Sequence, residues 1–470
     1  MKAGMIVVSL IGLTSTSTAV ATPSWHDLAI TAPQYGRYLY RTASEEPFFW
    51  QADTAWELVH KLNKTFIDFY LRTRAEQGYN AVQTIAISEN NGTTRANIYG
   101  DLPFANSDTT QPNGAYFQLI DWTVERAASY GILMVLVPAW GNWISGGWHE
   151  TEESLFNDTN GANTPDVDPA TLVGTIEDTT HLWVSMRSGV KHGEKAQGYE
   201  PVILFHPTAG RIARPASTPM AYGHLMLPNE EDRVSIDAVQ SGHATPESLG
   251  PFTPFEARDS TKNYELIAAM RDGFTGPVLD LENHYEGAHY NFDPSIRSGT
   301  RRNVWQMYEP RSDLLRDSDY YSPSVNQNAS GSWRIDIFFK GATQIQYVTK
   351  PLQNLTIDEL EQLEPARHLL SSPSGYTDIA VNAFESTRFI SVLASETRNR
   401  FYVYTGHGDS FGLNVGNGSE RSGTARWFSP RDGEYYSTST VEVPANVTRV
   451  DFTPPSGGSV DDDWLLVLEF

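Results

Sequence analysis

Short apolar runs alternate with amphipathic stretches from about residue 40 to residue 350. Ile132–Pro138 is almost wholly apolar, as a strand buried on both faces should be. Tyr116–Tyr130, just before it, carries apolar residues at helical spacing and stops at Gly131. This alternation predicts βα units and a parallel sheet. Further strands are predicted over 48–52, 80–87, 201–205, 235–239 and 278–281, and further helices over 65–77 and 264–272.

The pattern changes after about residue 357. Short β-type runs, separated by Gly, Asn, Ser and Asp, occupy 388–393, 400–404, 441–444 and 464–470. Regularly spaced short strands with turn residues between them predict an all-β sandwich. We therefore expect a second domain, with the boundary near residues 353–366.

The first 21 residues have the features of a secretory signal peptide. Lys2 supplies a positive charge, Met5–Leu13 is a short apolar core, and Ala19-Val20-Ala21 fits a cleavage site. No long apolar run follows, so no membrane span is expected. The sequence thus predicts a secreted, extracellular protein. Asn-X-Ser/Thr sequons, which support secretion and predict a glycoprotein, lie at Asn63, Asn91, Asn157, Asn328, Asn354, Asn417 and Asn446.

Charge and cysteine content exclude several classes of function. The formal net charge is −23, from 34 Lys plus Arg against 57 Asp plus Glu. A chain of this charge is a poor partner for nucleic acid or for anionic lipid. Because there is no cysteine, disulfides, thiolate metal sites and cysteine nucleophiles are impossible.

Most of the predicted strands end in residues of catalytic type. In a (β/α) barrel the carboxyl ends of the strands build the active site, which makes this pattern a candidate site. The alternative is that strand ends are polar merely because they meet solvent, but the mixture of acid, imidazole, amide and indole favours a site. The residues concerned are Asp53, Gln83, Trp140, His206, Gln240, His243, Asp280 and Glu282.

Catalysis by carboxylates is the remaining possibility, because the sequence lacks the motifs of other common enzyme classes. Gly-X-Ser-X-Gly, a phosphate-binding loop and His-Glu-X-X-His are all absent. A metal near His284 and His289 stays open as a minor alternative, and no cofactor is expected. Two carboxylates in one pocket are the minimal requirement for glycoside hydrolysis. Alternation places Asp280 and Glu282 on one face of a strand, where crowding should raise the pKa of at least one of them.

Several segments together resemble the apiosidase-like glycoside hydrolases. The matching stretches are 47–58, 70–80, 99–104, 137–141, 205–210, 240–243, 280–286 and, in the tail, 425–433. The resemblance implies a (β/α)8 TIM barrel over residues 22–356 and a β-sandwich labelled as collagen-binding over 357–470. It also implies a hydrolase of pectin-type side chains in plant cell walls, with a polysaccharide or oligosaccharide as its partner.

The resemblance further implies a catalytic Asp and Glu. The Glu corresponds to Glu282, and the Asp corresponds best to Asp178, within Val173–Thr179. The residues expected to line the sugar pocket or to tune this pair are Asp53, Trp56, Gln83, Trp140, His206, Gln240, His243, Asp280, Tyr285 and Glu286.

The chain departs from the family pattern in two places. A Gly-Gly-Asp turn expected before the catalytic Asp is not intact, and residues 295–302 run straight into 303–308 without an eighth strand. A barrel lacking a strand exposes unpaired edges. Three alternatives stay open: other residues bridge the gap, the coding sequence lacks exons, or the protein is a non-catalytic carbohydrate-binding or wall-associated protein. The sandwich could also be the functional part, with Trp427 either in its core or on its binding surface.

Overall fold

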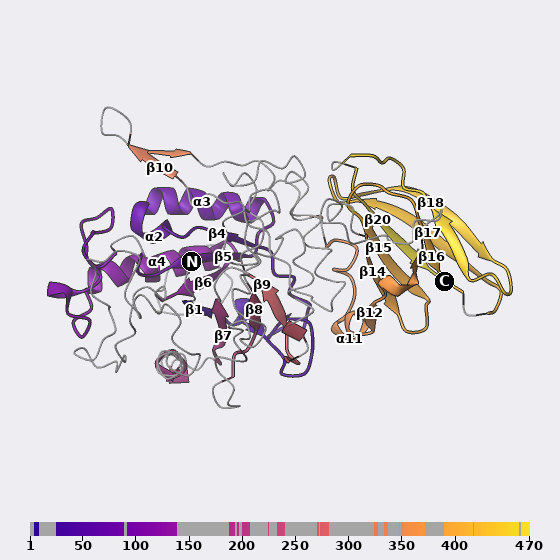
Figure 1. Cartoon of the computed structure of the whole chain (residues 1–470). Coiled ribbons are helices and arrows are strands. Elements are labelled where there is room, and N and C mark those ends of the chain that lie inside the picture. The colour runs from indigo at the N-terminus through magenta and orange to yellow at the C-terminus, as the bar shows by residue number, and fades with distance from the viewer. Residues whose placement is uncertain are drawn as a thin grey trace, which may run out of the picture.

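The computed structural model shows two lobes side by side, an α/β lobe and a β-rich lobe (Figure 1). The structure describes residues 4–8, 25–88, 92–138, 188–192, 195–196, 200–206, 224, 233–239, 270–271, 273–281, 324–327, 333–336, 347, 349–371, 390–416, 418–459 and 462–470. Within these ranges, no helix is both long and apolar enough to cross a bilayer.

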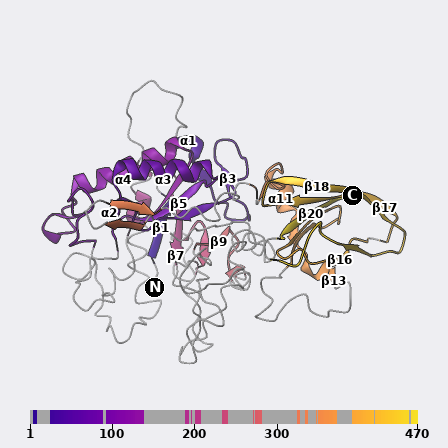
Figure 2. The ribbon, with the colours of Figure 1, turned by 90° about the horizontal axis from the view of Figure 1, so that it is seen from above.

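Three parallel strands form one side of the α/β lobe. β4 (Ala52–Thr54) pairs with β5 (Ala81–Ile85), and β5 pairs with β6 (Leu133–Val137). Helix α3 (Lys64–Glu76) links β4 to β5, and α4 (Gly114–Ser129) links β5 to β6. The two helices run side by side along one face of the sheet (Figure 2). These are the βα units that the alternating pattern predicts.

Both helices begin at a capping asparagine and end just before a glycine. Asn63 caps α3 by accepting a hydrogen bond from the backbone N–H of Phe66 at 3.0 Å, and Asn113 caps α4 in the same way. Each helix is followed by a glycine in the left-handed region, Gly78 at φ 93° and Gly131 at φ 76°. Glycine reaches this conformation without the steric cost of a Cβ atom, so the chain can turn there into the next strand.

Three further parallel strands continue the order of the barrel. β7 (Val202–His206) contacts β8 (Asp237–Val239) through a parallel bridge, and β8 pairs in parallel with β9 (Val278–Asp280). The described strands thus supply six parallel barrel strands. A closed eight-stranded barrel is not shown by the described part of the chain, so the predicted architecture is supported only as a barrel-type α/β lobe.

The place between β6 and β7 is taken by β1 (Gly4–Val8). β1 runs antiparallel to both neighbours, whereas the six barrel strands are parallel. In a (β/α)8 barrel a fourth parallel strand would lie here. The segment expected to be the apolar core of a signal peptide therefore occupies the fourth position of this sheet in the full-length chain.

Two apolar layers separate the inside of the barrel from its helices. Trp50, Ala52, Ala81, Val135 and Leu204 belong to a buried cluster on the inner side of the strands. Alternate residues of the same strands pack outward beneath α3 and α4. That outer cluster includes Val82, Met134 and Leu136 from the strands and Ile67, Leu71, Leu119 and Val124 from the helices. Because side chains alternate along a strand, a polar residue two positions from a member of the inner cluster also faces inward.

The C-terminal lobe is two antiparallel sheets around a shared core. The larger has the order β12-β14-β15-β20-β17-β18 and the smaller has the order β13-β16-β19. Trp427 packs against Phe411 in that core, which settles its place as interior. The strands are β12 (Leu363–Pro365), β13 (Leu370–Ser371), β14 (Ile390–Ser395), β15 (Arg400–Thr405), β16 (Phe411–Asn414), β17 (Arg421–Ser429), β18 (Glu434–Val443), β19 (Arg449–Phe452) and β20 (Trp464–Glu469).

Helix α11 (Ile357–Glu361) joins the lobes. Thr356 and Glu359 cap it reciprocally, as a capping box. The Arg37 guanidinium binds the Glu361 carboxylate at 3.0 Å and so ties α11 to the α/β lobe. The remaining described elements are α1 (Trp25–Leu28), β2 (Ile30–Thr31), β3 (Tyr40–Arg41), α2 (Leu58–Lys61), the 3-10 helices Ala105–Ser107 and Arg367–Leu369, and the hairpin of β10 (Ser324–Gln327) with β11 (Trp333–Asp336).

Candidate active site

Three polar residues lie on the inner side at the carboxyl ends of the barrel strands. Thr54 follows the inward Ala52 by two residues, Gln83 lies between two inward residues of β5, and His206 follows the inward Leu204 by two. Thr54 and Gln83 are direct partners in the parallel register. All three are buried. They form the polar end of an otherwise apolar barrel interior, where ligands bind in this architecture.

An indole, that of Trp56, lies at this end of the barrel. Trp56 is half-buried, packs on the inner cluster and meets the His206 ring edge-on, with 5.8 Å between ring centroids. An indole face beside an imidazole can hold a sugar ring by stacking while nearby polar groups bind its hydroxyls. The structure therefore brings together Trp56, Gln83 and His206, three of the residues that the sequence pointed to.

Among the residues that the structure describes, buried polar atoms at this end lack a hydrogen-bond partner. They include the amide nitrogen Nε2 of Gln83 and the hydroxyl Oγ1 of Thr54. A buried donor left unpaired costs roughly 1–3 kcal/mol, so a ligand hydroxyl placed here would gain interactions that the empty site lacks. Sequence reasoning missed Thr54. Because side chains alternate along a strand, Thr54 faces inward if its neighbour Asp53 faces outward, but the sequence did not show which way Asp53 faces.

Asp53 does not face the barrel interior, contrary to the sequence-based expectation. Its carboxylate accepts a hydrogen bond from the Tyr70 hydroxyl at 2.5 Å and pairs with Arg74 Nε at 2.5 Å, both on α3. Burial raises the pKa of the Asp53 carboxyl, and Arg74 and Tyr70 oppose the rise. The reason for the correction is strand alternation: Ala52 and Thr54 point inward, so Asp53 points to the helix layer.

Asp280 is displaced from the expected site for the same reason. Leu279 and Leu281 belong to the inner cluster, so Asp280 between them faces outward. Its register partner is Val239, on the same side of β8 as Asp237. Asp237 is fully buried, and the ring of His224 contacts its carboxylate through Nδ1. These acids therefore belong to the layer behind the barrel wall.

A buried polar cluster that the sequence did not predict lies in the loops after β4 and β5. The Ser88 hydroxyl donates to Glu57 Oε1 at 2.6 Å. His60 is 5 % exposed, and within the described part of the chain neither of its ring nitrogens has a hydrogen-bond partner. Burial lowers the pKa of His60, Glu57 raises it, and Arg95 and Lys61 lower it further. The signal in the sequence was Glu57, a charged residue directly after the aromatic Trp56.

The other predicted site residues lie outside the described residues. They are Trp140, Asp178, Gln240, His243, Glu282, Tyr285 and Glu286. The proposed catalytic pair, Glu282 with Asp178, is among them. Over the described ranges, His, Asp and Glu side chains do not gather in groups of three or more that could hold a metal ion.

Comparison with protein families gives two matches. The model of the family described as "Apiosidase-like, catalytic domain" matches residues 33–359. That of the family described as "Putative collagen-binding domain of a collagenase" matches residues 379–469. Among proteins of curated function, none matches this sequence significantly.

Solved structures similar to this chain are glycoside hydrolases. One, titled only as a glycoside hydrolase, is 17 % identical at a TM-score of 0.67, with 96 % of this chain and 98 % of that chain covered. A glycoside hydrolase of family 5 from Bacteroides vulgatus is 17 % identical at a TM-score of 0.67, covering 95 % and 94 %. A second glycoside hydrolase of that organism, whose assignment is only proposed in its title, reaches a TM-score of 0.51 at 11 % identity, covering 94 % and 82 %. At these identities the likeness shows a shared fold.

Proposed function

The chain belongs to the apiosidase-like family, and from this premise we propose that it is a glycoside hydrolase whose sugar binds at the carboxyl ends of the barrel strands. The observation that carries the proposal is the Gln83 amide nitrogen, which is buried on the inner side of the strands, has no hydrogen-bond partner among the described residues, and lies at the same end of the barrel as the Trp56–His206 ring pair. A site that buries unpaired donors next to an aromatic face suits a ligand rich in hydroxyls.

The described residues would bind and orient the sugar. Trp56 offers the stacking face, Gln83 donates to a hydroxyl, and Thr54 exchanges a hydrogen bond with a neighbouring one. Glu282 would act as nucleophile or base and Asp178 as general acid, in a mechanism with two carboxylates. Both roles rest on the resemblance in sequence and on the chemistry of glycoside hydrolysis.

Pectin-type side chains are the substrate that we propose, together with secretion directed by residues 1–21. Both follow from the sequence: the family resemblance gives the substrate, and the apolar segment with its small-residue cleavage site gives the export. Sequencing the N-terminus of the exported protein tests the second point, because cleavage after Ala21 leaves Thr22 as the first residue.

Release of sugar from plant-wall polysaccharides, rhamnogalacturonan II included, tests the activity. We expect the wild-type chain to release product and Glu282→Gln to release none at an unchanged melting temperature. Gln83→Ala should raise KM about tenfold, which corresponds to the ~1.4 kcal/mol expected of one hydrogen bond. The matched control is Gln118→Ala, at an exposed position on α4. Full activity of Glu282→Gln would refute the catalytic assignment.

Carbohydrate binding without hydrolysis is the second candidate function. An antiparallel strand in the fourth barrel position favours it, because a barrel completed in this way departs from the architecture on which catalysis depends. Retention on a wall polysaccharide without product release, unchanged in Asp178→Asn, would support binding alone.

A further inference from the structure

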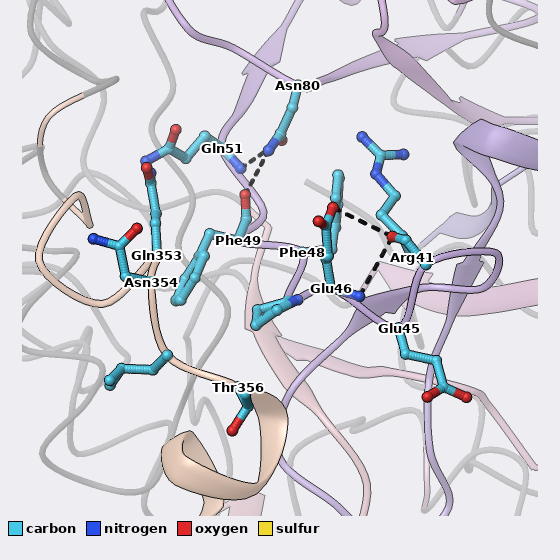
Figure 3. Close-up of a pocket in the computed structure, with 13 residues that line it drawn as sticks. Arg41, Glu45, Glu46, Phe48, Phe49, Gln51, Asn80, Gln353, Asn354 and Thr356 are labelled. Carbon is cyan, nitrogen blue, oxygen red and sulfur yellow. Dashed lines mark hydrogen bonds between the residues drawn. The ribbon is translucent and has the colours of Figure 1, made fainter.

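A cavity of about 640 Å³ opens at the amino ends of β4 and β5, at the other end of the strands from the candidate active site. At about 3.3 Å per residue, the three residues from Gln51 to Thr54, and from Asn80 to Gln83, separate the two by roughly 10 Å. One wall is the turn Arg41–Glu46, and the facing wall is the linker Gln353–Thr356 (Figure 3). Its volume is in the range of small-molecule sites.

The base of this cavity is aromatic and buried. Phe48 and Phe49 line it and are buried to 4 % and 6 % exposure. The Arg41 guanidinium lies 4.4 Å from the centroid of the Phe48 ring. The adjoining turn is closed by two backbone hydrogen bonds of 2.8 Å: the Arg41 N–H donates to the Glu46 carbonyl, and the Glu45 N–H donates to the Arg41 carbonyl. The shape of this wall is therefore set before any ligand arrives.

Three amide side chains are held in place around the base. Asn80 accepts from the Gln51 backbone N–H at 2.9 Å and donates to the Phe49 carbonyl at 2.6 Å (Figure 3). Gln51 and Gln353 both donate to the Thr349 hydroxyl, at 3.3 Å and 3.0 Å. Fixed amides beside aromatic rings lower the entropic cost of binding, because the protein does not have to order them.

We propose that this cavity is a saccharide-binding site, separate from the candidate active site. Amide groups that can donate and accept, next to an apolar base, match the alternation of hydroxyls and C–H faces on a sugar ring. Glu45 and Glu46 lie at the mouth, in a chain of net charge −23. Two carboxylates outweigh the one guanidinium, Arg41, among the lining residues, so the site favours neutral sugars over uronates.

The saccharide can come from two sources. Asn354 is exposed, lines the cavity and starts the sequon Asn354-Leu355-Thr356, so a glycan attached to it would have its first sugars at the mouth. The other source is a soluble oligosaccharide. The ligand chemistry is the same in both cases, and the test distinguishes them.

The soluble source is tested on the unglycosylated full-length chain in a Gln83→Ala background, which weakens binding at the other end of the barrel. N,N′-diacetylchitobiose and cellobiose should protect 41–49 and 353–356 from hydrogen exchange, with dissociation constants in the millimolar range, and digalacturonate should not. The pair Gln353→Ala with Asn354→Ala should weaken binding at least fivefold. Thr448→Ala, at an exposed position of the sandwich, is the control.

The attached source is tested on the chain secreted from a glycosylating host. Protection of 41–49 without added sugar, lost in Asn354→Gln, identifies the glycan as the occupant. Protection only by added disaccharide identifies a soluble ligand. Absence of protection in both experiments, or equal binding of digalacturonate, would overturn the proposal. Neither result depends on hydrolysis, so the two proposals fail separately.

Discussion

Asp53 shows how the alternation of side chains along a strand determines whether a residue can contact a ligand in the barrel. The sequence places it at the end of the first barrel strand, where catalytic groups gather, but its carboxylate faces α3 and binds Arg74 and Tyr70. The Arg74 guanidinium also lies 5.4 Å and 5.3 Å from the ring centroids of Tyr70 and Tyr79. Asp53 is thus a buried anchor between sheet and helix rather than a sugar ligand.

Removing one partner of this buried pair should be costly. We expect Arg74→Met to lower the free energy of unfolding by about 3–5 kcal/mol, because it leaves the Asp53 carboxylate buried without its cation. Urea unfolding measures the change. Arg72→Met on the same helix is the matched control: its pair with Glu76 is exposed and should contribute about 0.5 kcal/mol or less. Equal losses in the two variants would contradict the anchoring role.

His60 should make stability depend on pH. Burial lowers its pKa in the folded state, so below about pH 6.5 the unfolded chain binds a proton that the folded chain resists. The contribution of His60 to the free energy of unfolding is therefore greatest above pH 6.5. It falls as the pH drops toward 5, with a slope of at most about 1.4 kcal/mol per pH unit. Urea unfolding at a series of pH values should show a flatter profile for His60→Gln. An unchanged profile would mean that other groups cause the dependence.

At the scale of elements, the place of β1 in the sheet conflicts with the expected role of the same residues as a signal peptide. The expected cleavage after Ala21 removes it, and with it the strand that lies between β6 and β7. Strand removal leaves two unpaired edges, and an unpaired edge promotes aggregation. A molecule that is cleaved after Ala21 therefore cannot keep β1 in its sheet.

We predict that a chain beginning at Thr22 is less stable than the full-length chain. β1 pairs five residues with β7 and two with β6, and at roughly 1 kcal/mol per net hydrogen bond the loss should be several kcal/mol. Thermal unfolding of the two purified chains measures it. Equal melting temperatures would indicate that β1 adds nothing to the folded protein and that residues 4–8 serve only as a leader.

At the scale of the whole molecule, the two lobes have separate cores. The inner and outer clusters of the α/β lobe share no residue with the core of the sandwich. Among the described residues, the contacts that join the lobes include a hydrogen bond that the Lys350 ammonium donates to the Gly433 carbonyl at 2.6 Å. Gly433 has φ 75°, and a Cβ there would meet the Tyr347 ring at 2.5 Å, so the junction is closely packed at this point.

Separate cores predict separate unfolding. We expect calorimetry of the full-length chain to resolve two transitions, because polar contacts between lobes couple domains weakly. The chain of residues 357–470 should keep the transition of the sandwich, lowered by the loss of the Arg37–Glu361 pair. A single transition that disappears in the fragment would show that the lobes fold as one unit.

The sequence by itself predicted the order and kind of several of the described elements. Periodicity marked α3 and α4, and apolar runs marked β5, β6 and β7, because burial of a whole strand or of one helical face leaves a local pattern. The same patterns marked the sandwich strands β14, β15 and β20. Gln83 and His206 were predicted in the same way, as polar residues within or at the ends of such runs, and Trp56 was predicted from the family resemblance.

Tertiary structure alone decided which side of the barrel wall each polar residue occupies. Asp53 and Thr54 are neighbours in sequence, yet one binds a helix and the other faces the barrel interior, since a shift of one residue reverses the face of a strand. The antiparallel place of β1 and the cavity between residues 41–49 and 353–356 join segments far apart in the chain. Such pairings depend on which surfaces meet in the folded chain, and no local pattern encodes them.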